Sequence, residues 1–170
     1  MASCFLLAAC GGDDPDDARP QPTTTAPSTT QPQDPDEQAL RSLAEDWFRA
    51  VRQAYMEDTD LADLEPLAVE RYLAGVRDEI EAFRDSGNEA RPGDRTRHEV
   101  LSVAVDGDAA VLVECVIDAD LVLSSQGQVL NDEVQANLYE TDALRDGDEW
   151  RLSGRRTLDE VDGSIECPAQ

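Results

Sequence analysis

Lysine is absent from this chain of 170 residues. All 14 basic residues are therefore arginines, and against 38 acidic residues they leave a formal net charge of −24 at pH 7. Nucleic acids and anionic lipid surfaces attract basic patches, so this charge argues against both as binding partners. We interpret the acidic surface mainly as a feature that favours solubility or tolerance of salt.

Histidine occurs only once. His98 lies between Arg97 and Glu99 at the expected start of a strand, a position that predicts a solvated rather than a catalytic side chain. The sequence also has no G-x-S-x-G motif, no lysine for a Ser–Lys pair and no recognisable Ser–His–Asp arrangement. We therefore predict no catalytic residues, but this does not decide between a binding protein and an enzyme.

Long hydrophobic runs are missing as well. Near the start only residues 5–9 are continuously apolar, which is far short of the ~20 residues of a membrane-spanning helix. This run ends at Cys10, so that residues 7–10 read LAAC, and two glycines follow. The four residues resemble the lipobox of bacterial lipoproteins, in which small residues precede an obligatory cysteine. The alternative is a chance LAAC in an ordinary tail.

The lipobox resemblance implies a role for Cys10. In that family the cysteine thiol receives a diacylglyceryl group, a signal peptidase cuts before the cysteine, and the new amine is often acylated with a fatty acid such as palmitate. Two or more acyl chains anchor a protein stably, whereas one is marginal. We therefore expect a lipoprotein anchored in the cell membrane on its extracytoplasmic side.

The segment before Cys10 has only the end of a signal peptide. A secretory signal begins with positive charge and continues with an apolar stretch of about 7–15 residues, yet residues 1–4 contain no arginine. We interpret residues 1–9 as the end of a longer signal peptide. Cys4 would then be removed with it.

Residues 10–34 form the expected tether. They hold most of the nine prolines, interspersed with Thr, Ser, Gln and Asp, and such a composition offers too little apolar surface to fold. Fully extended at ~3.1 Å per residue, the tether would reach about 70 Å from the membrane. Its stretch from Thr23 to Thr30 is of a kind that carries sugars in exported proteins.

A globular domain is expected over residues 35–170. Asp34 can cap a helix that has Pro35 at its first position and Glu37 three residues after the cap. Apolar residues then recur every three or four positions to about Glu57, which predicts one amphipathic helix: Leu40, Leu43, Ala44, Trp47, Phe48, Val51, Ala54 and Tyr55. A second helical region, interrupted near Pro66, continues to residue 83.

After His98 the apolar period changes from helical spacing to two. Alternating residues predict strands around 101–105, 111–117, 134–138 and 150–158, and Asp-Gly-Asp turns at 106–108 and 146–148 join two of the pairs. The turns lack the alternating oxygen ligands of a calcium loop, so we expect no metal site. The sequence thus predicts an α+β domain: N-terminal helices packed on a curved four-stranded antiparallel sheet.

This order of elements resembles a known fold. A long first helix bearing Trp47-Phe48, a helical pair, and a sheet ending in residues 149–152 (EWRL) resemble the cone-shaped, cystatin-like fold of nuclear-transport-factor-2-like proteins. Together with the lipobox and the Thr/Pro linker, the chain looks like cone-domain lipoproteins of actinobacteria. The resemblance implies a binding or accessory domain, or an isomerase or hydratase with a pocket between helix and sheet.

Two cysteines remain in the domain. Cys115 falls on the apolar face of a strand and Cys167 near the end of the chain, and disulfides persist in exported domains. We predict a disulfide that closes a loop of about 52 residues and adds roughly 4 kcal/mol to stability. The alternative is two free thiols, and the spacing does not suggest a metal site.

The third strand carries a polar face with two interpretations. On the outer side of the sheet it would be solvated surface, which we favour. Turned into the cone, it would line a pocket in which a buried carboxylate could move a proton. The residues concerned are Glu133, Gln135, Asn137 and Tyr139, with Asp118 or Asp120 beside them.

Three functions therefore stay open. We favour a membrane-anchored module that binds an envelope protein or a small ligand without chemistry and without a cofactor. An isomerase- or hydratase-like enzyme and a structural spacer are the alternatives.

Overall fold

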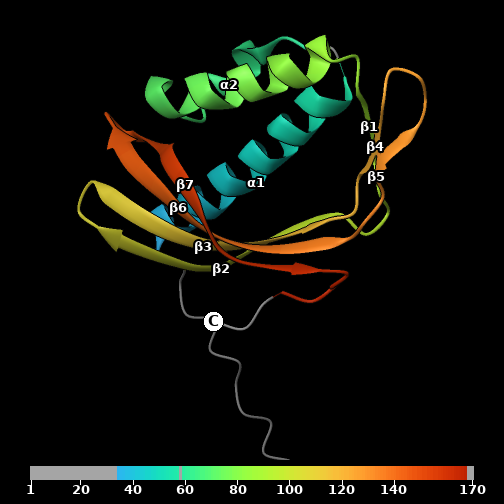
Figure 1. The fold of residues 1–170 in the computed structure, drawn as a ribbon. Helices are drawn as coiled ribbons and strands as arrows, with labels where there is room; N and C mark the ends of the chain where they lie inside the picture. Colours follow the sequence, from blue (N-terminus) through green and yellow to red (C-terminus); the bar gives the residue numbers. More distant parts are fainter. Residues whose placement is uncertain (1–33, 58, 168–170) are drawn as a thin grey trace, which may run out of the picture. The chain divides into compact units, whose positions relative to one another are not determined.

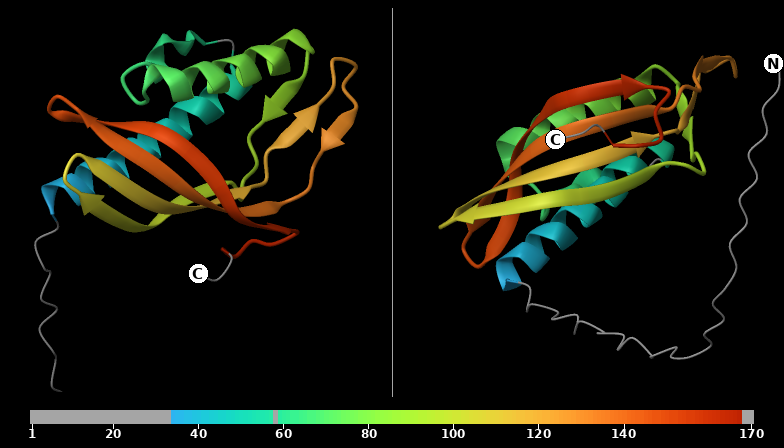
Figure 2. Two further views of the ribbon diagram at one scale, coloured as in Figure 1. Left: turned by 60° about the vertical axis from the view of Figure 1, so that its left-hand side comes forward. Right: turned by 90° about the horizontal axis from the view of Figure 1, so that it is seen from below.

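The computed structural model describes residues 34–57 and 59–167 (Figures 1 and 2). The expected signal-peptide end, Cys4, the lipidated Cys10 and the tether up to residue 33 lie outside the described residues.

Helix α1 spans Pro35–Met56 and confirms the expected long first helix. Its start follows from the local sequence, because the Asp34 side chain accepts a hydrogen bond from the backbone N–H of Asp36 at 2.9 Å and Pro35 needs no partner for an N–H. Asp36 also accepts from Arg145 at 2.5 Å and from the Trp150 indole at 3.2 Å. The N-terminus of α1 is thereby attached to the far end of the sheet.

The second helical region divides in two, as the break near Pro66 predicts. A 3-10 helix, η1, covers Leu61–Leu64, and α2 covers Glu70–Asp85. Near the end of α1, Arg84 of α2 donates to the carbonyls of Ala54, Glu57 and Thr59 at 2.8–3.1 Å, which satisfies acceptors that a helix end leaves open. None of the described helices is long and apolar enough to cross a membrane.

The four expected strands form one antiparallel sheet in the order β2-β3-β6-β7. Their bounds are Arg97–Asp106, Ala109–Asp118, Gln135–Asp146 and Glu149–Asp162. Both Asp-Gly-Asp stretches are tight hairpin turns, with Gly107 and Gly147 at φ of 61° and 67°, a backbone conformation that glycine adopts without strain.

A second sheet was not predicted. Strands β1 (Glu89–Arg91), β4 (Leu121–Leu123) and β5 (Val129–Asn131) pair in the order β1-β4-β5. Figure 1 shows this small sheet beyond the end of the large one. Three-residue strands contain too few alternations to register as a pattern, so these segments read as loops in the sequence.

Both helices cover the same face of the large sheet (Figures 1 and 2). The main core lies between these layers and includes Leu40, Trp47, Ile80, Leu112 and Leu152, none more than 2% exposed. Burying such side chains stabilises the fold by about 1.5–3 kcal/mol each. Apolar side chains therefore fill part of the space between the helices and the sheet, and a pocket lies beside them.

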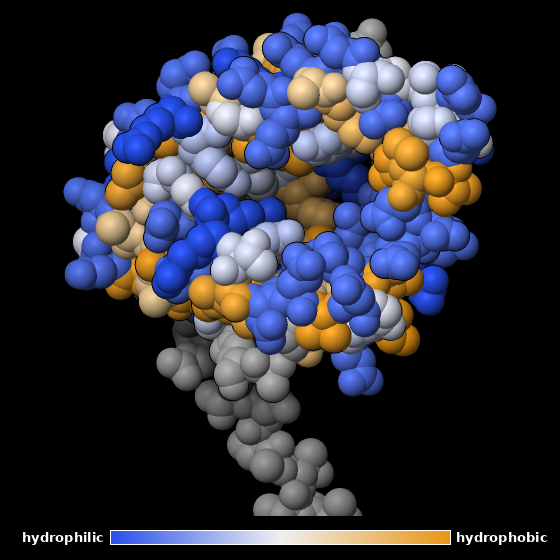
Figure 3. All heavy atoms as spheres, viewed as in Figure 1, coloured by the Kyte–Doolittle hydropathy of each residue, from blue (hydrophilic) through white to orange (hydrophobic). Residues whose placement is uncertain are grey.

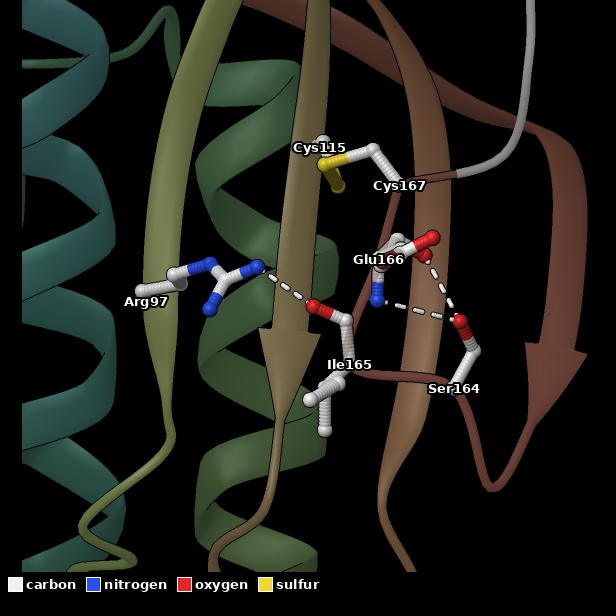
Figure 4. The surroundings of a disulfide bond; sticks show 6 residues. All are labelled: Arg97, Cys115, Ser164, Ile165, Glu166 and Cys167. Atoms are coloured by element: carbon white, nitrogen blue, oxygen red, sulfur yellow. Dashed lines mark hydrogen bonds between the residues drawn. A yellow bond between two sulfur atoms is a disulfide. The ribbon is translucent and has the colours of Figure 1, made fainter.

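The opposite face of the sheet is covered too. Cys115 and Ile117 of β3 pack there with Val134 and Ala136, and the C-terminal segment brings Cys167 over them (Figure 4). The Cys115–Cys167 disulfide is confirmed, with an S–S distance of 2.11 Å. Consequently the stretches 114–117 of β3 and 136–138 of β6 are buried on both faces. A polar residue in these stretches is therefore shielded from solvent whichever face it points to.

Candidate functional site

A pocket of about 470 Å³ lies between the helices and the sheet. In Figure 3 it is visible as a hollow with apolar atoms at its base. Both helices and both sheets contribute to its walls. This volume lies within the range of about 300–1,000 Å³ that is usual for small-molecule sites.

Six aromatic side chains lie in the lining. Among the described residues every aromatic side chain except Trp150 borders this pocket: Trp47, Phe48 and Tyr55 of α1, Tyr72 and Phe83 of α2, and Tyr139 of β6. Two pairs are in ring contact, Trp47 with Tyr72 at 5.3 Å between centroids and Tyr55 with Phe83 at 5.2 Å, edge to face. The pocket therefore has an aromatic wall supplied mostly by the helices.

A row of buried polar groups crosses the sheet beneath the helices. His98 Nε2 of β2 lies 2.6 Å from Oε2 of Glu114 on β3, and Arg155 Nη2 of β7 lies 3.1 Å from Oε1 of the same carboxylate. The side chain of Glu114 is fully buried. An ionised carboxylate only accepts hydrogen bonds, so Nε2 of His98 is the donor.

The electrostatics of this row keep Glu114 ionised. Burial raises the pKa of Glu114, but the hydrogen bond from His98 and the positive charge of Arg155 outweigh burial and leave the pKa below its usual value. The ionised carboxylate of Glu114 on β3 thus binds side chains of β2 and β7 and links these three strands.

His98 is not solvated, so the sequence-based expectation was wrong. Its side chain is 3% exposed, and its ring stacks on Phe48 of α1 at 5.0 Å. The reason is that β2 turns His98 toward the helices, opposite Val116 of β3. His98 borders a second, more open depression of about 410 Å³ along α1 and is not part of the lining of the main pocket.

Arg155 forms one wall of the pocket. Its Nε donates to the hydroxyl of Thr141 at 3.2 Å, and its guanidinium carbon lies 4.3 Å from the ring centroid of Tyr139. This distance is typical of a cation–π contact. Tyr139 is thereby held at the pocket wall, and burial raises the pKa of its hydroxyl.

The pocket mouth is held by a second ion pair. Arg52 of α1 donates two hydrogen bonds of 2.7 Å to Asp120, which also accepts from the Gly93 N–H at 2.8 Å and from Thr96 Oγ1 at 2.7 Å. Burial raises the pKa of Asp120, but these donors and the charge of Arg52 outweigh burial, so the pKa lies below its usual value. The arrangement joins α1 to the loops that flank the small sheet.

Gly93 is required at this mouth. A Cβ atom on residue 93 would lie 1.9 Å from the carbonyl oxygen of Ala119. No side chain fits at that distance. Glycine lets the two backbones approach closely enough for the Gly93 N–H to reach Asp120.

Asp118 differs from Glu114 and Asp120, which are both paired with an arginine. It lines the same pocket, retains solvent exposure, and accepts a hydrogen bond from the Asp120 N–H at 2.9 Å. Partial burial, followed by the negative charge of Asp120, raises its pKa above the usual value. No cation among residues 34–57 and 59–167 forms an ion pair with it.

The polar residues of β6 lie on the sheet face that the helices cover, so the favoured expectation of a solvated outer surface was wrong: Gln135 is paired with Asp118, Asn137 with Val116 and Tyr139 with Glu114. Tyr139 and Asp118 line the pocket. Asn137 is 4% exposed and donates to Gln135, which itself donates to Asp162 at 3.2 Å. Glu133 is exposed just before β6 begins.

Glu114, Arg155 and Arg52 were missed by sequence reasoning. Glu114 did leave a signal, because it is a lone charge inside the apolar run from Ala109 to Ile117, and such a charge needs a buried partner. The partners could not be identified in advance, since Arg155 is 41 residues away and the chain has 14 arginines. Within the described part of the chain, no cluster of His, Cys, Asp and Glu is suited to hold a metal ion.

Comparisons with known proteins identify the fold only. No family model matches the chain, and no curated protein matches it. Among solved structures, the intermembrane-space region of the chloroplast protein ARC6 is similar with a TM-score of 0.63 and 14% identity, over 74% of this chain and 98% of that one. A protein from Kribbella flavida gives 0.46 and 17%, over 73% and 93%.

Another neighbour is a nuclear-transport-factor-2-like protein of unknown function from Silicibacter pomeroyi, with a TM-score of 0.41 and 18% identity over 71% of this chain and 93% of that one. Identities this low carry no information about activity. The domain therefore has an α+β fold shared with known structures, and its function has to be argued from its own residues.

Proposed function

We propose that the domain is a non-catalytic module that binds a small molecule in the pocket between its helices and its sheet. One observation carries the proposal: the pocket has six aromatic side chains in its lining, and both of its arginines are already paired within the protein, Arg52 with Asp120 and Arg155 with Glu114.

The paired carboxylates Glu114 and Asp120 fix the shape of the pocket and are not available for acid–base catalysis. A general base needs a lone pair that is free to reach the substrate. Glu114 is fully buried behind the wall, and Asp120 accepts hydrogen bonds from three residues. Groups fixed in this way preform a cavity, which reduces the entropy that a ligand loses on binding.

We further propose that the module is anchored to the outer side of the membrane through Cys10. The LAAC sequence and the Pro/Thr-rich segment after it support this proposal. A tether of this kind would leave the pocket accessible in the envelope space.

An isomerase- or hydratase-like enzyme is the second candidate. The observation in its favour is Asp118, a pocket carboxylate with a raised pKa and no paired cation, near the hydroxyl-bearing Tyr139 in the same lining. A raised pKa is common at catalytic sites but occurs at binding sites as well.

The test is a fragment screen by ligand-observed NMR on the full chain. Val76 of α2 borders the pocket, so Val76→Trp should fill it, whereas Val105→Trp at the exposed end of β2 should not. We expect small amphipathic fragments to bind the wild type and the Val105→Trp control and to lose binding in Val76→Trp. Equal binding to all three would refute the pocket as the site, and conversion of a bound fragment would favour the enzyme.

A further inference from the structure

We infer that the pocket recognises an organic cation, an alkylated ammonium group attached to an apolar body. This inference rests on the proposed binding function and adds the class of ligand. It follows from the aromatic lining and from the charges that line the pocket without a counter-charge.

The aromatic rings are the feature of the pocket that most favours a cationic ligand. The face of an aromatic ring is electron-rich and attracts a cation, most strongly when both are shielded from water. Tyr55, Tyr72 and Phe83 are half-buried and come from two different helices. Such a wall can bind an alkylated ammonium group, whose diffuse charge needs no hydrogen-bond acceptor.

The pocket already contains one contact of this kind. The Arg155 guanidinium carbon lies 4.3 Å from the centroid of Tyr139. That ring face is occupied, so the ligand would use the rings of α1 and α2 on the opposite wall.

The charges of the lining leave a surplus of acid. The lining contains five charged groups. Arg52 and Asp120 neutralise each other, and Arg155 is neutralised by Glu114 behind it. Asp118 and Glu79 remain. Both are exposed, and neither forms an ion pair with another described residue, although the positive charge of Arg52 acts on Asp118 from a distance. A bound cation would supply the missing positive charge, whereas an anion would meet repulsion.

Glu79 lies close enough to act on the aromatic wall. After burial, its negative charge is the further cause of the raised pKa of Tyr55. At Tyr72 it also raises the pKa, but the positive charge of Arg155 acts there in the opposite direction and has the larger effect. The negative charge of Glu79 therefore favours a positive ligand beside Tyr55.

An anionic ligand is the competing interpretation, since Arg155 lines the pocket and its Nη1 takes part in no hydrogen bond between described residues. We favour the cation because Arg155 is already charge-balanced and Asp118 is not. The net charge of −24 also concentrates cations near the protein surface, more strongly at low salt.

The experiment measures binding of four soluble probes to the full chain by isothermal titration calorimetry. Choline, 3,3-dimethylbutan-1-ol and 3,3-dimethylbutanoate have similar shapes but are positive, neutral and negative. Benzyltrimethylammonium adds an apolar body to the cation. We expect choline to bind roughly tenfold tighter than the alcohol, within the range of cation–π energies, benzyltrimethylammonium to bind tightest, and the carboxylate to bind weakest.

Asp118→Asn should weaken binding of both cations several-fold and leave binding of the alcohol unchanged. Asp106→Asn, in the β2–β3 turn and outside the pocket, is the matched control and should change nothing. Equal affinity for choline and the alcohol, or preference for the carboxylate, would overturn the cation while leaving a binding pocket intact. Absence of binding by every probe at millimolar concentration, together with a failed fragment screen, would overturn both proposals.

Discussion

Nε2 of His98 lies 2.6 Å from Oε2 of Glu114 in the middle of the sheet face that the helices cover. Arg155 approaches the other oxygen of the same carboxylate at 3.1 Å. Three strands thus meet at one buried charge. Because removing one partner leaves the others unpaired, this cluster gives the sharpest stability prediction.

Glu114→Gln should lower the free energy of unfolding by about 3 kcal/mol, since it leaves Arg155 without a counter-charge. The value lies at the low end for a buried pair because Arg155 is 20% exposed. Urea denaturation measures it. Glu140→Gln is the control, as Glu140 pairs with the exposed Arg156, and it should cost less than about 1 kcal/mol. Equal losses in the two variants would contradict the buried pairing.

Acid should unfold the protein partly through this same residue. The folded pKa of Glu114 lies below its ordinary value of 4.5, so its contribution to stability is complete above that value and disappears as the pH falls through the folded pKa. The groups facing it are His98, Arg155 and Thr141. In Glu114→Gln the stability curve below pH 4.5 should be flatter than in the wild type, as monitored by circular dichroism; parallel curves would count against this assignment.

Removing the disulfide should destabilise the domain without changing its fold. Cys115 and Cys167 are 52 residues apart, and closing a loop of that length stabilises by about 4 kcal/mol. Thermal unfolding of the wild type with and without reductant measures the effect. The double variant Cys115→Ala, Cys167→Ala should unfold like the reduced protein and show no response to reductant.

Asp120→Asn should loosen the pocket mouth. The substitution removes the charge that receives two hydrogen bonds from Arg52, and hydrogen bonds to charged groups contribute about 1.5–3 kcal/mol. We expect a loss of about 2 kcal/mol in denaturant unfolding. Asp46→Asn, which breaks an exposed pair with Arg49, should be close to neutral. A neutral Asp120→Asn would show that the mouth is held by other contacts.

Cys10→Ser should release the protein from the membrane, because the thiol that would carry the lipid is lost. The measurement is membrane fractionation of cells that express the native gene. Cys4→Ser is the control and should stay in the membrane fraction, since that residue is expected to be removed. Wild-type protein found free in the cytosol with an unmodified Cys10 would refute the anchor.

The long elements could be predicted because their patterns are strong. Helix α1 combines a cap, a proline and an uninterrupted apolar stripe, and the hairpins β2–β3 and β6–β7 are marked by Asp-Gly-Asp turns. The disulfide also followed, since only two cysteines remained in the domain. In each case the information is local or limited to very few candidate residues.

The orientation of the strands could not be predicted in the same way. Alternation identifies a buried face only when the other face meets water, and here the C-terminal segment covers Cys115 and Ile117 while the helices cover Glu114 and Val116. His98 is buried for a related reason, because α1 crosses the strand on which it lies. These relationships join residues far apart in the sequence.

The aromatic wall has a spectroscopic consequence. The chain has two tryptophans and three tyrosines, and all of them except Trp150 border the pocket. Near-ultraviolet absorption and intrinsic fluorescence arise from these two residue types. In this protein one of the two tryptophans and all three tyrosines therefore contribute these signals from the walls of one cavity, so that an optical titration would report on its occupancy without any added label.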